Sequence, residues 1–229
     1  MLGSGRVTAQ VTEGFYRIVT NSDKTFYLCP AQDPDNLSVG YWVDGNLMLT
    51  TKKNPPADYT VWRLSAGSGD NDGFSQLIHQ ASGHYIINDK TDRVAEAIHL
   101  GSLPVDDADT WFGITFTSSN YNIKGKAVTG SYSFNPYNGN QNYYTAASAS
   151  NTGIIGYWDA NNAGSQWKLV EVVPVIALSG DDFTISFPVS ATIYYTTDGS
   201  DPTASATRHV YSSAFQLTGG DYKVRAGAA

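Results

Sequence analysis

The feature that most constrains this chain is a threefold repeat of short strand-like segments, each repeat closing on a tryptophan. Trp62, Trp111 and Trp167 are separated by 49 and 56 residues. Between them lie short runs rich in Val, Ile, Thr, Tyr and Phe, which Gly, Asn, Asp and Pro interrupt. This pattern is typical of short β-strands joined by turns. Because a single repeat cannot bury its own apolar face, we expect the three tryptophans to meet in one shared core.

Each repeat contains four candidate strands, so the sequence predicts twelve strands before residue 172. The expected strands are 14–19, 25–28, 46–50 and 60–64 in the first repeat, 73–78, 83–87, 95–98 and 110–114 in the second, and 121–123, 132–134, 153–158 and 165–170 in the third. Such regular short strands favour a closed all-β architecture.

The composition excludes several classes of protein. Only 15% of the residues are charged, with 14 Lys and Arg against 21 Asp and Glu, whereas 5 Trp, 15 Tyr and 9 Phe supply many rings. Intrinsic disorder requires few aromatics and many charges, and a nucleic-acid binder requires a basic face. No apolar run approaches the ~20 residues of a membrane span. We therefore expect neither a nucleic-acid partner nor a membrane span, and the profile favours an extracellular all-β module.

The repeats resemble the ricin-type β-trefoil family over residues 12–172. The resemblance rests on the Tyr-x-Ile/Leu openings, the hairpin at 83–86 and the closing tryptophans. Family members usually carry Gln two residues before the closing Trp, where this chain has Thr60, Asp109 and Ser165. The resemblance implies a β-trefoil with lectin-like surfaces, but the class also includes protease inhibitors and actin-bundling proteins, so the fold alone does not decide the function.

A different pattern begins after Pro174. The run Ile193–Thr203 reads Ile-Tyr-Tyr-Thr-Thr-Asp-Gly-Ser-Asp-Pro-Thr, and the chain closes with Tyr-Lys-Val-Arg-Ala at 222–226. Residues 174–229 are similar to the chitobiase/β-hexosaminidase C-terminal-type domain. That resemblance implies a small immunoglobulin-like β-sandwich that is an accessory beside catalytic or binding modules in secreted bacterial glycan-degrading proteins. The expected fold class is therefore all-β, a β-trefoil followed by a small sandwich.

One segment of the third repeat combines rings with short polar side chains, which is the chemistry of a sugar site. The segment contains Tyr157, Trp158, Asp159, Asn161 and Asn162. An aromatic face packs against the apolar side of a pyranose, and carboxylate and amide groups bind its hydroxyls. A neighbouring stretch, 137–144, is rich in Tyr and Asn. Packing of Trp158 within the barrel is the alternative.

The first repeat contains a partial echo of this segment. Gly-Tyr-Trp at 40–42 matches Gly-Tyr-Trp at 156–158, and Asp44 corresponds to Asp159. We therefore expect Trp42 and Asp44 to form a second candidate sugar site. Solvent exposure of Trp42 and Trp158 beside polar groups would favour sugar binding, whereas burial of both rings would favour a scaffold.

Catalysis and metal binding find little support in the sequence. The carboxylates at 106–109 fall in an expected loop, and Asp198 and Asp201 belong to Asp-Gly and Asp-Pro turns. The four histidines are scattered, and the single cysteine, Cys29, lies in an apolar run and is expected to be a buried small hydrophobe. We therefore expect no enzyme activity, no catalytic residue, no cofactor and no metal.

These observations predict a non-catalytic carbohydrate-binding accessory region of a secreted or surface bacterial glycan-utilisation protein. The expected partners are a glycan or oligosaccharide and a catalytic domain of the same parent protein. Residues 1–6 lack the apolar segment of a signal peptide, so the chain is either intracellular or the mature part of an exported protein. The glycan-related expectation favours the second alternative, a secreted or cell-surface location. The alternative is a structural spacer or protein-interaction module that binds no sugar.

Overall fold

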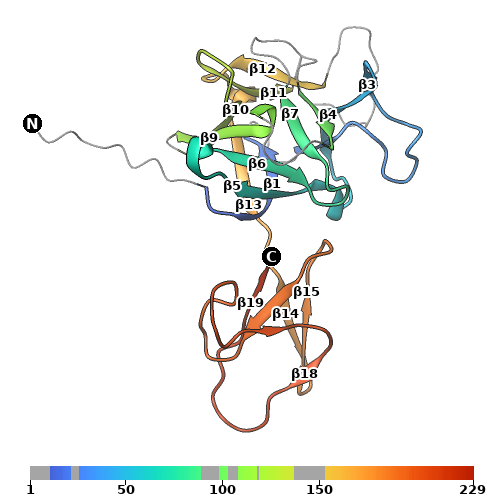
Figure 1. The fold of residues 1–229 in the computed structure, drawn as a ribbon. Helices are drawn as coiled ribbons and strands as arrows, with labels where there is room; N and C mark the ends of the chain where they lie inside the picture. Colours follow the sequence, from blue (N-terminus) through green and yellow to red (C-terminus); the bar gives the residue numbers. More distant parts are fainter. Residues whose placement is uncertain (1–10, 22–25, 89–97, 103–107, 118, 137–152) are drawn as a thin grey trace, which may run out of the picture. The chain divides into compact units, whose positions relative to one another are not determined.

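The chain folds into two compact units, Met1–Val170 and Glu171–Ala229. The structure is a computed structural model that describes residues 11–21, 26–88, 98–102, 108–117, 119–136 and 153–229. Its ordered segments are strands and short 3₁₀ turns (Figure 1). Within these described residues, no helix is long and apolar enough to cross a membrane.

Strands of the first unit fall into three groups of four, with one additional two-residue strand, β3 (Trp42–Val43), in the first group. The first group is β1 (Gly14–Thr20), β2 (Phe26–Pro30), β4 (Asn46–Lys53) and β5 (Val61–Ala66). The second is β6 (Ser75–His79), β7 (Tyr85–Asn88), β8 (Ile98–Gly101) and β9 (Trp111–Thr117). The third is β10 (Asn120–Gly125), β11 (Tyr132–Pro136), β12 (Ile155–Asp159) and β13 (Trp167–Glu171).

The outer strands of the three groups close into a barrel. They pair in the order β13-β10-β9-β6-β5-β1, and β1 pairs again with β13, so these six strands form a ring. The inner strands of each group form the hairpins β2–β4, β7–β8 and β11–β12. Adjacent hairpins touch where Leu47 pairs with Leu100 and where the Thr50 hydroxyl donates 2.7 Å to the Gly153 carbonyl. A six-stranded barrel covered by three hairpins is a β-trefoil.

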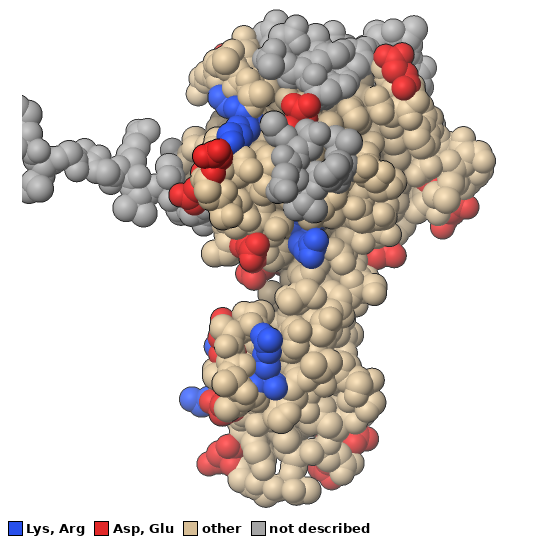
Figure 2. Space-filling view, viewed as in Figure 1, with Lys and Arg blue, Asp and Glu red and all other residues tan. Residues whose placement is uncertain are grey.

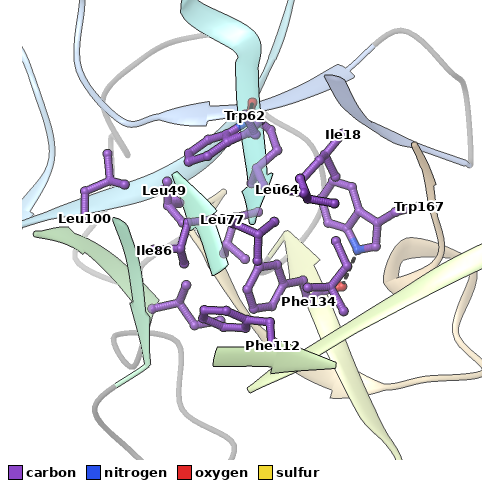
Figure 3. Packing of buried hydrophobic residues seen from close by; sticks show 14 of the residues in the cluster. Ile18, Leu49, Trp62, Leu64, Leu77, Ile86, Leu100, Phe112, Phe134 and Trp167 are labelled. Atoms are coloured by element: carbon purple, nitrogen blue, oxygen red, sulfur yellow. Dashed lines mark hydrogen bonds between the residues drawn. The ribbon is translucent and has the colours of Figure 1, made fainter. Parts of the chain in front are cut away.

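Twelve fully buried side chains, four from each repeat, occupy equivalent positions in the strand pairing and form one core (Figure 3). In repeat order, the four equivalent sets are Ile18, Leu77 and Ile123; Leu28, Ile86 and Phe134; Leu49, Ile98 and Ile155; Trp62, Phe112 and Trp167. Each repeat therefore supplies one third of an apolar centre that none could bury alone.

The expectation that all three closing tryptophans meet in this core is wrong for Trp111. Tyr16 pairs with Trp62 and Tyr121 with Trp167, whereas the corresponding residue of the second repeat pairs with Phe112. Because successive side chains of a strand point to opposite faces, placing Phe112 in the core turns Trp111 away from it. In each repeat the core residue lies two residues after the end of the preceding 3₁₀ turn, at Trp62, Phe112 and Trp167, whereas Trp111 follows its turn directly and is the first residue of β9.

The indole N–H groups confirm this difference. Trp62 Nε1 donates to the Leu28 carbonyl at 3.0 Å, and Trp167 Nε1 donates to the equivalent Phe134 carbonyl at 2.8 Å. The Trp111 indole N–H is buried without an acceptor among the described residues. Trp62 and Trp167 therefore hold β2 and β11 against the barrel, both by packing of their rings and by the hydrogen bonds of their indole N–H groups.

The second unit contains two antiparallel sheets of three strands in the described chain. One sheet consists of β14 (Val175–Ser179), β15 (Asp182–Ser186) and β18 (Phe215–Gln216); the other consists of β17 (His209–Val210), β16 (Ile193–Thr196) and β19 (Arg225–Ala228). Phe215 stacks on Phe183 at 5.5 Å within its sheet and on Tyr195 of the other sheet at 4.3 Å between ring centroids. Ring stacking thus joins the sheets into a small immunoglobulin-like sandwich.

Asp198 and Asp201 are turn residues of this unit, as the sequence predicts. The Asp198 carboxylate accepts from the Ser200 amide at 2.9 Å and from the Thr207 hydroxyl at 2.8 Å, ahead of Gly199 at φ +79°. Hydrogen bonds from the Ser200 hydroxyl and amide and from Thr207 lower the pKa of Asp198 to about 2. Such hydrogen bonds stabilise the carboxylate form of Asp198, so the role of this side chain is to stabilise its turn.

Candidate functional site

A groove of about 1010 Å³ lies beside the β3–β4 hairpin of the trefoil unit. Its walls come from the first two repeats, which is why residues far apart in the sequence line it. We call it the Trp42 groove, because Trp42 lines it and is 49% exposed. Leu37, also exposed, lines the same groove. The volume falls at the upper end of the roughly 300–1,000 Å³ that is usual for ligand pockets.

A tight turn places Trp42 at the surface. Trp42 pairs with Leu47 and Val43 with Asn46, and the two connecting residues, Asp44 and Gly45, have φ of +50° and +82°. A two-residue hairpin loop requires positive φ at both central positions, which Asp-Gly provides. Asp44 therefore builds the turn at the tip of the hairpin. It is exposed but does not line the groove, whereas Gly45 and Asn46 do.

His79 and Tyr59 form a fixed part of the groove wall. His79 Nε2 lies 3.0 Å from the Tyr59 carbonyl oxygen, which can only accept, so Nε2 carries the proton. His79 Nδ1 then accepts from the Ser82 hydroxyl at 2.9 Å, and the Tyr59 hydroxyl donates to the Gln32 carbonyl at 2.9 Å. Burial lowers the pKa of His79 to about 4, so this imidazole is neutral at pH 7.

The charged groups that line the groove are acidic. Asp58 and Asp109 are among the lining residues, together with His84 and His99, and no Lys or Arg belongs to the described lining. Across the described chain, no group of three or more His, Cys, Asp or Glu is arranged to hold a metal ion. The groove therefore combines an aromatic ring, short polar side chains and a negative field, which suits a neutral, hydroxyl-rich ligand better than an anion.

The third-repeat segment is only partly available to a ligand. Trp158 is 42% exposed and lies opposite Ser133 in the β11–β12 hairpin. Tyr157 is 4% exposed, and its hydroxyl accepts from the Gly125 amide at 2.9 Å, while burial raises its pKa. The expectation that Tyr157 belongs to an exposed sugar platform is therefore wrong. Strand alternation sends the Tyr157 ring into the core and the Trp158 ring outward.

The polar residues after Trp158 organise a turn at the surface. The Asp159 carboxylate accepts from the Asn161 amide at 2.8 Å, and the Asn162 side-chain oxygen accepts from the Gly164 amide at 2.9 Å. All three side chains are exposed beside Trp158, but two of them already cap local backbone groups. The neighbouring stretch 137–144 lies outside the described residues.

The sequence echo between Trp42 and Trp158 does not reflect equivalent positions in the fold. In the hairpin pairing, Tyr157 corresponds to Thr51, so Trp158 corresponds to Lys52. Trp42 belongs instead to the additional strand β3, which the other described repeats do not contain. The residues that sequence reasoning did not connect, such as Tyr59 and His79, come from strands and turns that only the closed barrel brings together.

The fold and its grooved surface define the class of protein: an all-β chain in which a β-trefoil is followed by a small immunoglobulin-like sandwich. Within it, residues 178–228 match the family model of the chitobiase/beta-hexosaminidase C-terminal domain. This match lies in the second unit. A comparison with curated proteins gave no match.

Three solved structures are similar to this chain at low sequence identity. A Polyporus squamosus lectin, bound to the epitope Neu5Aca2-6Galb1-4GlcNAc, has a TM-score of 0.52 at 12% identity over 72% of this chain and 51% of the lectin. ThreeFoil, a designed threefold symmetric protein, has a TM-score of 0.50 at 15% identity over 69% of this chain and 99% of ThreeFoil. A mosquitocidal holotoxin has a TM-score of 0.54 at 11% identity, over 89% of this chain and 22% of the toxin. These similarities show the fold.

Proposed function

We propose that this chain is a non-catalytic carbohydrate-binding region whose principal site is the Trp42 groove. The observation that carries the proposal is the Trp42 ring, which is 49% exposed on a paired hairpin that lines a cavity of about 1010 Å³. An indole face held at the surface offers dispersion contacts to the apolar side of a pyranose at little desolvation cost. Asn46 and His84 line the same groove and supply polar groups for the sugar hydroxyls.

The comparisons support a glycan-related role. The Polyporus squamosus lectin, which has this fold, was solved with an oligosaccharide, and the matched family of the second unit is named for chitobiase and β-hexosaminidase. We propose further that the chain belongs to a secreted or surface bacterial glycan-utilisation protein that also contains a catalytic domain. Tethering to an enzyme raises the effective sugar concentration and compensates for a weak single site.

The groove is better suited to binding than to glycoside hydrolysis. A glycosidase general acid needs an environment that raises its pKa, usually burial in an apolar pocket. Of the two carboxylic acids that line the groove, Asp58 is exposed and Asp109 is only partly buried, so neither is enclosed in an apolar pocket. This argument supports the non-catalytic assignment. The Trp158 segment is the second candidate sugar site, because its indole is 42% exposed and polar side chains follow it.

The test is a glycan-array screen with neutral oligosaccharides on the wild-type chain and two tryptophan variants. Trp42→Ala is expected to abolish binding, and Trp42→Phe is expected to retain part of it because an aromatic face remains. Trp158→Ala is the matched control, a similarly exposed tryptophan from another hairpin. Loss of binding in Trp158→Ala alone would move the site to the third repeat.

The alternative is a structural spacer or protein-interaction module. If the wild-type chain binds no glycan while its unfolding transition is cooperative, the carbohydrate-binding proposal fails and this alternative is favoured. An exposed tryptophan would then serve as a contact for another protein.

A further inference from the structure

A second cavity of the trefoil unit differs from the Trp42 groove in charge. Its volume is about 520 Å³, and its lining includes Phe74, Lys124, Lys126 and Tyr132. None of the described residues lines both cavities. We call it the lysine pocket. Its size lies within the roughly 300–1,000 Å³ of small-molecule sites.

Both lysines come from the end of one strand. Lys124 and Lys126 are separated by Gly125, which ends β10 and whose amide donates to the Tyr157 hydroxyl at 2.9 Å. Lys124 belongs to β10 and Lys126 to the turn that follows it, and both line the pocket together with Gly125. A Cβ at Gly125 would lie 3.0 Å from the Tyr157 hydroxyl, so this position accommodates only glycine without a shift.

Both ammonium groups are tethered by neutral acceptors. Lys124 Nζ donates to the Gly130 carbonyl at 2.9 Å. Lys126 Nζ donates to the Asp70 carbonyl at 2.5 Å and to Asn71 Oδ1 at 2.7 Å. In the described part of the chain, neither lysine forms an ion pair with a carboxylate. An ammonium has three N–H donors, so Lys124 retains two and Lys126 retains one for a ligand. The pocket therefore presents positive charge that the protein does not neutralise.

Aromatic rings stand beside this charge. Lys126 Nζ lies 5.2 Å from the centroid of the Phe74 ring, which together with Tyr132 supplies apolar wall. Cation–π contact holds the ammonium over the ring without removing its charge. A ligand that fits must therefore combine an anionic group with an apolar face.

We propose that the lysine pocket binds an acidic sugar, a pyranose that carries a carboxylate or a sulfate ester. The oxyanion contacts Lys124 and Lys126, and the ring packs on Phe74 and Tyr132. The choice of a sugar over another small anion rests on the proposed carbohydrate-binding function. A polyanion such as a nucleic acid is disfavoured, because the chain has a net charge of −7 and the visible face in Figure 2 shows no extended blue surface of Lys and Arg.

The test is isothermal titration of the full chain with trigalacturonate, galactose 6-sulfate and neutral galactotriose. We expect binding of an acidic ligand that weakens as salt rises. Lys124→Met and Lys126→Met are each expected to weaken it about 10- to 100-fold, the value of a charge-assisted hydrogen bond. Lys124→Arg should retain binding, and Lys223→Met is the matched control, with the same loss of charge in the second unit.

The outcomes separate this proposal from the proposed function. Binding of trigalacturonate alone or of galactose 6-sulfate alone supports the pocket and identifies the anionic group. If neither binds, or if both Met variants bind as tightly as wild type, the lysine pocket is refuted, whether or not neutral glycans bind at Trp42. Acidic-sugar binding that survives Trp42→Ala but not Lys124→Met supports the pocket even if the groove fails. Should Lys126→Met not fold, Lys124→Met and Lys124→Arg decide.

Discussion

The two core tryptophans and their displaced counterpart offer a matched test of the trefoil register. Trp62 and Trp167 each donate an indole hydrogen bond to a carbonyl of the neighbouring hairpin, at 3.0 and 2.8 Å. Trp111 is 6% exposed, and its indole N–H has no acceptor in the described structure. The substitution of Phe for Trp removes the N–H in each case and keeps an aromatic ring. The same change should therefore have different consequences at Trp62 and Trp111.

The magnitudes follow from burial and hydrogen bonding. Replacement of a buried indole by the smaller phenyl ring removes roughly 40 Å² of apolar contact, about 1 kcal/mol at ~25 cal/mol per Å². At Trp62 the lost hydrogen bond adds about 1–3 kcal/mol, so Trp62→Phe should lower the free energy of unfolding by about 2–4 kcal/mol. At Trp111 removal of an unsatisfied donor offsets the apolar loss, so Trp111→Phe should range from about no change to a gain of ~2 kcal/mol.

Urea unfolding followed by tryptophan fluorescence measures this difference. All five tryptophans lie in the first unit, so the signal reports on the trefoil. Trp167→Phe should match Trp62→Phe, because its bond is equivalent. The register would be refuted if Trp111→Phe destabilised the trefoil as much as Trp62→Phe did, since Trp111 would then be the true core residue of the second repeat.

Three further predictions concern single side chains of the trefoil. The pKa of His79 falls from 6.5 in the unfolded chain to about 4 in the folded chain, so on acidification the unfolded state takes up the proton first. As the pH falls from 6.5 to 4, the free energy of unfolding should therefore drop by up to about 3 kcal/mol. Urea titrations of His79→Gln should lack this pH-dependent component. Gly45→Ala introduces a Cβ at φ +82°, should cost about 1 kcal/mol, and should weaken neutral-glycan binding by disturbing the hairpin of Trp42. Burial raises the pKa of the Cys29 thiol, so iodoacetamide should alkylate it only after denaturation; rapid labelling of the folded chain would contradict its placement in the core.

The sequence was a good guide to elements that depend on periodicity. Eleven of the twelve expected strands of the three repeats recur in the structure, because apolar alternation and turn residues are local signals. The twelfth, expected at 95–98, lies mostly outside the described residues, and β8 begins at Ile98. The domain assignment of the second unit rested on the run Ile193–Thr203, and residues 178–228 match the corresponding family model. The trefoil register was harder to predict, because Trp111 and Phe112 are adjacent and both are apolar. Only the pairing with β6 shows which of them enters the core.

The candidate site was less predictable than the core, because core side chains share one confined space whereas surface side chains do not. The core positions must fill one shared space, so each repeat keeps a large apolar side chain there, as Leu28, Ile86 and Phe134 show. The position occupied by Trp158 faces away from the core and carries no such requirement. The equivalent residue is Lys52 in the first repeat and Gly101 in the second. Surface residues can therefore diverge freely between repeats, and a Gly-Tyr-Trp echo does not identify equivalent sites. The same freedom allows one trefoil to present an acidic groove and a basic pocket, so sugar-binding residues must be located repeat by repeat from the structure.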